Sequence, residues 1–177
     1  MTQNRPQANE YAPYYEKYVA MVPDGEIAET LDAQLREMKL LLRTLSEEGA
    51  EFRYAAGKWS IKEVLGHISD AERIFAYRML RIARADQTPL AGFEQDDYVK
   101  TGNFSARPLA ELLEEFTAAR RATIALARSL DEAAWLRRGM ANQKEISVRA
   151  QAFIIAGHER HHRVVLQERY FPALPRG

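Results

Sequence analysis

Apolar residues recur at intervals of three and four along four stretches of this chain. This is the spacing of a helix that buries one face, and no stretch shows the apolar–polar alternation that predicts a strand. The predicted helices span about residues 27–47, 60–82, 108–130 and 147–170. The pattern therefore predicts an all-α fold, a four-helix bundle with one long connection.

Local signals at the helix ends support these limits. Asp24 is expected to cap the first helix, and Gly49 is expected to end it. Ser60, followed three residues later by Glu63, fits a capping box at the start of the second helix. Pro108 suits the first turn of the third helix.

The segments outside the helices divide the chain into one bundle domain and two short ends. Residues 86–104 hold Pro89, Gly92 and Gly102 and are too long for a tight turn, which predicts a crossover between helices or a lid over a site. Residues 130–139 are expected to form a turn with a buried tryptophan. The expected divisions are an irregular N-terminal arm at 1–25, the bundle at 26–172 and a tail at 173–177.

Charge and composition exclude several classes of function. Lys+Arg and Asp+Glu both number 25, so the chain lacks the basic excess of a dedicated nucleic-acid binder. It has no cysteine, which excludes disulfides, thiolate metal ligation and a cysteine nucleophile, and suits a reducing cytoplasm. No apolar run is long enough to cross a bilayer, and the N-terminus lacks the apolar region of a secretory signal. We expect a cytoplasmic protein with no membrane or nucleic-acid partner.

The four histidines occupy two of the predicted helices. With 100° per residue, His158 and His162 lie about 40° apart within the apolar stripe of the last helix, and His161 lies at its edge. His67 lies within the apolar stripe of the second helix. If the two helices are antiparallel neighbours, three imidazoles converge at one point.

Two interpretations of these histidines follow from spacing alone. A buried imidazole needs partners for both ring nitrogens, and one divalent ion takes a nitrogen from each of three rings. Zn²⁺ accepts three histidines and keeps a fourth position open for chemistry, and histidine ligation also suits Ni²⁺. The alternative is that each histidine is a hydrogen-bonded core residue. Spacing leaves both interpretations open.

Two motifs resemble the DinB-like superfamily, in its branch of YfiT-type metal-dependent hydrolases. They are residues 57–64 (GKWSIKEV), which lead into His67, and residues 156–162 (AGHERHH) in the last helix. The resemblance covers about residues 27–170 and implies a bundle with up-down-down-up topology and one long crossover connection. It also implies a Zn²⁺ or Ni²⁺ ion held by His67, His158 and His162 but not by His161. Many members are dimers, which implies a homodimer.

Three functions remain in competition. One is the transfer of a low-molecular-weight thiol, activated on the metal, to an electrophile; another is hydrolysis of a small molecule by metal-activated water. The third is a stress-associated binding or scaffold protein with a structural metal or none. A general base, or a residue that orients a ligand imidazole, is expected among three carboxylates: Glu159, Asp70 and Glu63. Arg78, near the His67 face, is a candidate for binding a substrate carboxylate, or else forms an ion pair across the helices.

Overall fold

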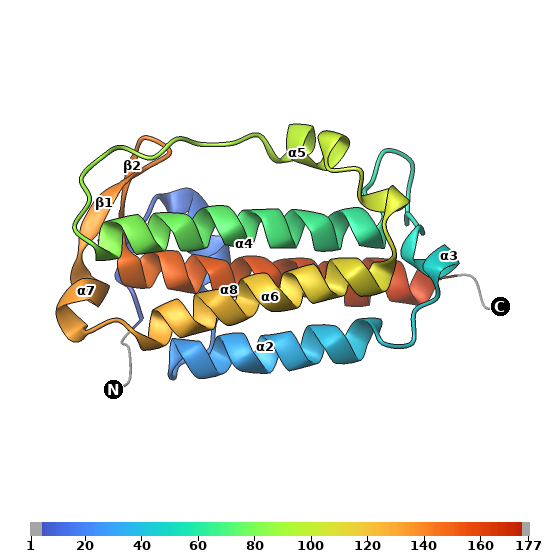
Figure 1. Ribbon diagram of the computed structural model, residues 1–177, viewed down its shortest axis with the longest axis horizontal. Helices are drawn as coiled ribbons and strands as arrows, with labels where there is room; N and C mark the ends of the chain where they lie inside the picture. The colour runs from blue at the N-terminus through green and yellow to red at the C-terminus, as the bar shows by residue number, and fades with distance from the viewer. Residues whose placement is uncertain (1–4, 175–177) are drawn as a thin grey trace.

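The computed structural model describes residues 5–174, so the expectations for residues 1–4 and 175–177 lie outside the described residues. Four long helices form a bundle, as predicted (Figure 1). They are α2 (Ile27–Leu42), α4 (Ile61–Ala83), α6 (Leu109–Arg128) and α8 (Val148–Val165). None of the described helices is long and apolar enough to cross a membrane.

The order of the helices around the bundle differs from their order in the chain. Helices α6 and α8 each pack against both α2 and α4, so α2 lies diagonally opposite α4 and α6 lies diagonally opposite α8. Helices α4 and α6 run in one direction, and α2 and α8 run in the other (Figure 1). The topology is therefore up-down-down-up, as expected. Because α4 and α6 are parallel, the chain between them must travel back along the whole bundle.

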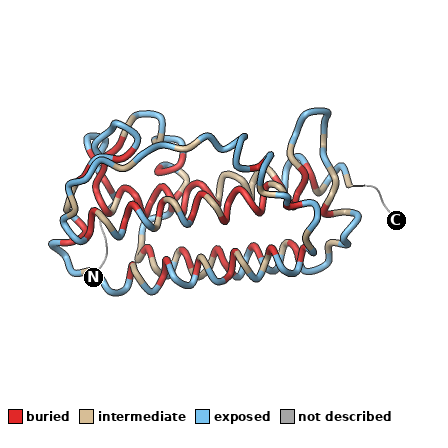
Figure 2. Tube along the Cα trace, turned by 45° about the horizontal axis from the view of Figure 1, so that its top comes forward, coloured by how far each residue is buried: buried red, intermediate tan, exposed pale blue. Residues whose placement is uncertain are grey.

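Inward-facing apolar residues form two core clusters, one toward each end of the bundle. Figure 2 shows how buried positions recur along the long helices, with exposed positions between them. Between the two clusters lies a set of buried polar side chains, which we call the polar belt. It consists of Gln34, His67, Glu72, Arg120, His158 and Glu159. The histidines of interest thus belong to a polar layer within an otherwise apolar interior.

The polar belt is organised around the Arg120 guanidinium, which is fully buried. Its Nε donates to both carboxylate oxygens of Glu72, at 2.7 and 2.9 Å, and its Nη1 donates to the Gln34 side-chain oxygen at 3.0 Å. The Gln34 amide in turn donates to the Ala156 carbonyl at 2.9 Å. Because these residues come from α6, α4, α2 and α8, one network joins all four long helices beside the histidines.

Two predicted helix limits are wrong. Helix α2 begins after Glu26, while Asp24 instead accepts a hydrogen bond from Arg5. The helix ends at Leu42, and Ser46 then caps a separate short helix, α3 (Glu47–Ala50), which contains Gly49. At the other end of the chain, α8 continues into a π-helical turn at Leu166–Tyr170.

The expectation that the chain contains no strands is also wrong. Strands β1 (Arg138–Ala141) and β2 (Lys144–Ser147) form an antiparallel hairpin. Its turn residues, Asn142 and Gln143, have φ of 49° and 61°, which matches the twist of a two-residue hairpin turn. Four-residue strands are too short to show a clear alternation. The preceding segment is a short helix, α7 (Glu132–Leu136), and its Trp135 is buried as expected.

The long connection is a crossover whose path is held by this hairpin. The Leu90 N–H donates to the Met140 carbonyl, and the Leu90 carbonyl accepts from the Asn142 N–H, both at 2.9 Å. The chain then forms α5 (Gln95–Thr101) and a 3-10 turn at Phe104–Ala106 before entering α6 (Figure 1). The crossover is therefore fixed to the body of the protein just before α5.

The N-terminal arm is more regular than expected. It contains two 3-10 turns (Ala8–Glu10 and Pro13–Tyr15) and the short helix α1 (Glu16–Val19), which packs against α8. The contact depends on Gly157, because a Cβ there would lie 2.0 Å from the Tyr18 carbonyl oxygen. This close approach places the Tyr18 ring against His158, with ring centroids 5.5 Å apart.

A buried carboxylate anchors the arm and makes stability depend on pH. Burial opposes ionisation of Glu10, but hydrogen bonds from Arg149, from the Gln7 N–H and from Ser147 outweigh it and lower the Glu10 pKa to about 2. Because the folded-state pKa lies below the ordinary 4.5, this stabilisation is complete above pH 4.5 and is lost as pH falls toward 2. Glu10→Gln is therefore expected to destabilise the protein by about 1–2 kcal/mol more at pH 7 than at pH 3.

Urea unfolding of the wild type and of Glu10→Gln at both pH values measures this difference. Glu29→Gln, at an exposed position of α2, is the matched control and is expected to change little at either pH. A Glu10→Gln effect that is equal at pH 3 and pH 7 would contradict the assigned pKa.

Candidate metal centre

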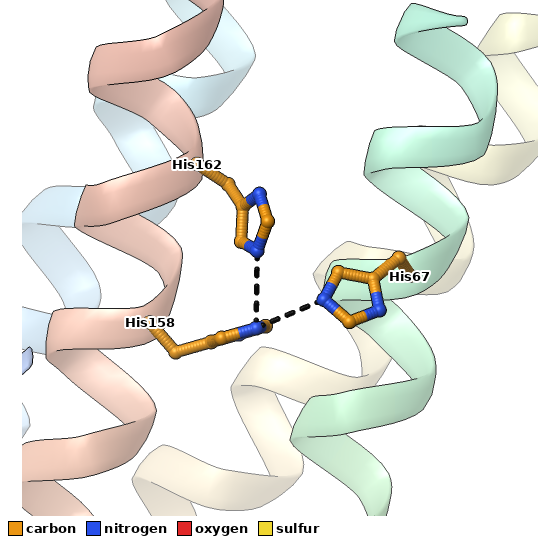
Figure 3. Close-up of side chains that lie close together, drawn as sticks. All are labelled: His67, His158 and His162. Carbon is orange, nitrogen blue, oxygen red and sulfur yellow. Dashed lines mark hydrogen bonds between the residues drawn. The ribbon is translucent and has the colours of Figure 1, made fainter. Parts of the chain in front are cut away.

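Three histidines converge at the edge of the polar belt, His67 from α4 and His158 and His162 from α8 (Figure 3). The Nε2 atom of His158 lies 3.0 Å from Nε2 of His67 and 3.2 Å from Nε2 of His162. His67 and His158 are buried, and His162 is partly buried. The arrangement follows from the i, i+4 spacing on α8 and from the antiparallel packing of α4 against α8.

The donor set fits a divalent cation better than it fits hydrogen bonds alone. An imidazole Nε2 carries either one hydrogen or one lone pair, so Nε2 of His158 cannot make a full hydrogen bond to both neighbours at once. A tetrahedral zinc ion with Zn–N distances of about 2.0–2.1 Å places its ligand nitrogens about 3.3 Å apart. The observed separations of 3.0 and 3.2 Å are close to that geometry.

The protonation of the three rings also suits metal binding. Burial lowers the pKa of His67 to about 4. Burial, followed by repulsion from the other histidines, lowers the pKa of His158 and of His162 well below the ordinary value. All three imidazoles are therefore neutral at neutral pH and keep a lone pair for a metal ion.

Aromatic side chains enclose the three rings. The Trp59 ring lies against His67, with centroids 4.8 Å apart, and the Phe75 ring lies against His158, with centroids 5.7 Å apart. His161 packs against the Tyr18 ring at 5.6 Å and is not one of the three clustered ligands. This packing limits rotation of the imidazoles and keeps their nitrogens directed toward one point.

Two cavities reach the histidines. The first cavity, of about 260 Å³, is lined by His67 and His158 together with the side chains of Tyr15, Tyr18, Phe75, Arg78, Phe93 and Glu94. The second cavity, of about 340 Å³, is lined by His162 together with Tyr54, Lys58, Trp59, His161 and Tyr170. Asp96 of α5 lines both cavities. The three-histidine cluster is thus accessible from two sides.

The three carboxylates considered as a general base or as partners of a ligand imidazole occupy three different environments. Glu159 is fully buried, its carboxylate accepts a hydrogen bond from Arg163, and burial raises its pKa to about 7. Asp70 lies beside Arg73 at 3.4 Å, and Glu63 closes the capping box with Ser60. None of the three lines either cavity in the described part of the chain.

The acidic side chains that do line the first cavity, Glu94 and Asp96, come from the crossover. They belong to residues 86–104, which the sequence predicts to be a crossover or a lid, but no spacing rule connects this segment with histidines on α4 and α8. Their position is set by the hydrogen bonds between Leu90 and the hairpin.

Arg78 lies where the sequence suggested, near the His67 face of α4, and is almost fully buried at 3% exposure. It lines the first cavity and donates a hydrogen bond to the Ala91 carbonyl at 2.6 Å. The ion pair considered for it does not form with any carboxylate among residues 5–174.

The fold and this cluster define a class of helical bundles in which the second and fourth long helices bring three histidines together. The chain belongs to the DinB superfamily, whose family model matches residues 30–166. Among solved structures, it is similar to YfiT from Bacillus subtilis, described as "a probable metal-dependent hydrolase with an unusual four-helix bundle topology". The two structures superpose with a TM-score of 0.74 over 94% of this chain and 91% of YfiT, and their sequences are 14% identical. This likeness shows that the two proteins share a fold. No curated protein matches the sequence significantly.

Proposed function

We propose that this chain binds one divalent metal ion, Zn²⁺ or Ni²⁺, through His67, His158 and His162, and that it hydrolyses a small molecule at that ion. The observation that carries the proposal is the convergence of three neutral imidazole nitrogens at a point open to two cavities. YfiT, which is described as a probable metal-dependent hydrolase, supports the same reaction class. An ion held there would act as a Lewis acid and would supply a nucleophile at neutral pH.

The chain's own residues provide the remaining chemistry. Asp96 is the carboxylate that lines both cavities, and its oxygens are placed to accept a proton from an attacking water. The rings of Trp59 and Phe75 pack against His67 and His158 and limit the rotation of these two imidazoles. Asp96 is therefore the general base of the proposed reaction.

A second candidate is thiol transfer, and the pair of cavities favours it. A low-molecular-weight thiol in one cavity and an electrophile in the other would meet at the histidine cluster. A purely structural metal site would instead be closed by protein ligands on all sides.

The proposal is tested by assaying metal-loaded and metal-free protein against activated esters, beginning with p-nitrophenyl acetate. Metal-loaded wild type is expected to accelerate hydrolysis, and Asp96→Asn is expected to lower kcat/KM by about a hundredfold, because a positioned general base contributes on that order. Asp97→Asn is the matched control, since Asp97 adjoins Asp96 but lines neither cavity. Equal rates with and without metal across the esters would contradict hydrolysis, and metal-dependent conjugation of a thiol would favour the second candidate.

A further inference from the structure

Two arginines are buried within the bundle, and they differ in one respect. Arg120 is 0% exposed and forms a two-oxygen ion pair with the Glu72 carboxylate. Arg78 is 3% exposed, yet in the described part of the chain no Asp or Glu pairs with it. Buried charges in proteins are normally paired, so the absence of an anion beside Arg78 requires an explanation.

The surroundings of Arg78 satisfy only part of its hydrogen-bonding capacity. One Nη donates to the Ala91 carbonyl at 2.6 Å, and the guanidinium lies 5.7 Å from the Phe75 ring and 6.0 Å from the Phe93 ring. The guanidinium also donates a hydrogen bond to the Tyr15 phenol oxygen, which only partly opposes the lowering of the Arg78 pKa by burial. An arginine nevertheless stays charged in proteins and carries five N–H donors, so donors remain free on the side of the cavity.

The first cavity has the volume and the lining residues of a site for a small organic anion. It measures about 260 Å³ and has aromatic walls that include Phe75 and Phe93, with the positive charge of Arg78 among them. A carboxylate matches the planar guanidinium through two parallel hydrogen bonds, and aromatic walls suit an apolar body attached to that carboxylate. His67 and His158 line the same cavity, so a ligand held by Arg78 would lie beside the histidine cluster.

We propose that Arg78 is a substrate-binding residue and that the first cavity takes a small organic carboxylate. The inference deepens the proposed function, because it places the substrate beside the proposed metal ion. Glu94 and Asp96 line the exposed mouth of the cavity and repel a second negative group. The ligand is therefore a monocarboxylate whose remaining part is neutral or positively charged.

The test compares two probes of equal shape, 3-phenylpropionate and the uncharged 3-phenyl-1-propanol, by isothermal titration calorimetry. Wild type is expected to bind the carboxylate at least about tenfold more tightly than the alcohol. Arg78→Met keeps the apolar stem and is expected to remove that preference, while Arg78→Lys, which keeps the charge without the planar fork, is expected to retain part of it. Arg84→Met removes one charge from the exposed end of the same helix and is expected to retain the full preference.

Other outcomes overturn the inference. They are equal binding of both probes by wild type, no binding of 3-phenylpropionate at millimolar concentration, or an unchanged preference in Arg78→Met. Inorganic phosphate that displaces 3-phenylpropionate at equal concentration would show a general anion site instead of one for organic carboxylates.

The titrations are made on metal-loaded and on metal-free protein, with metal content measured for each variant. Metal stoichiometry in Arg78→Met is expected to equal that of wild type, because Arg78 is not among the clustered ligands. If the protein prefers the carboxylate but binds no metal, the proposed function is contradicted and the inference about Arg78 stands. If it binds metal but shows no preference for the carboxylate, the inference about Arg78 is contradicted and the proposed function stands.

Discussion

His158→Ala protein is expected to contain no zinc or nickel while keeping the helical content of the wild type. Nε2 of His158 lies between the other two Nε2 atoms, at 3.0 and 3.2 Å, so its removal leaves two ligands that cannot enclose an ion. Loss of one of three ligands should lower metal affinity by about a hundredfold or more, since even residues that only orient a ligand contribute roughly ten- to hundredfold. The measurement is metal content by mass spectrometry on untagged protein, together with circular dichroism.

His161→Ala is the matched control for this experiment. His161 is adjacent to the cluster and contacts the His162 ring, with centroids 5.1 Å apart, but it is not one of the three converging ligands. This variant should therefore retain near-stoichiometric metal. Two results would contradict the metal site and indicate that the three histidines are ordinary core residues. One is a wild-type protein that binds neither Zn²⁺ nor Ni²⁺, and the other is full metal content in His158→Ala.

The second large effect concerns stability. Arg120→Met should lower the free energy of unfolding by about 3–5 kcal/mol, because it leaves the buried Glu72 carboxylate without its partner. It also removes the donor that holds Gln34, which in turn binds the Ala156 carbonyl two residues before His158. Urea unfolding followed by circular dichroism measures the change.

Two variants make the result specific to the ion pair. Arg121→Met, at the neighbouring exposed position of α6, is expected to change stability by no more than about 0.5 kcal/mol. The double variant Arg120→Met/Glu72→Leu is expected to recover much of the loss, since removing both charges leaves none unpaired. A loss below about 1 kcal/mol in Arg120→Met would show that the pair is not central to the bundle.

Local pattern alone was sufficient for the four long helices and for the faces on which the histidines lie. A helix repeats every 3.6 residues, so the direction of His158 relative to His162 depends only on their separation in the chain. The up-down-down-up order did not follow from periodicity but from the family resemblance. The hairpin was missed because four-residue strands joined through Asn142 and Gln143 give almost no periodic signal.

The surroundings of the histidines were decided by tertiary structure. Arg120 meets Glu72 across 48 residues of chain, and Gln34 meets Ala156 across 122. Asp96 reaches both cavities because Leu90, earlier in the same crossover, is bound to the hairpin. The sequence by itself determined which residues each helix turns inward. Only the packing of the helices decided that the buried charge of Arg120 meets an anion and that the buried charge of Arg78 faces a cavity. The reason is that these contacts join segments far apart in the chain, whose relative position cannot be read from local periodicity.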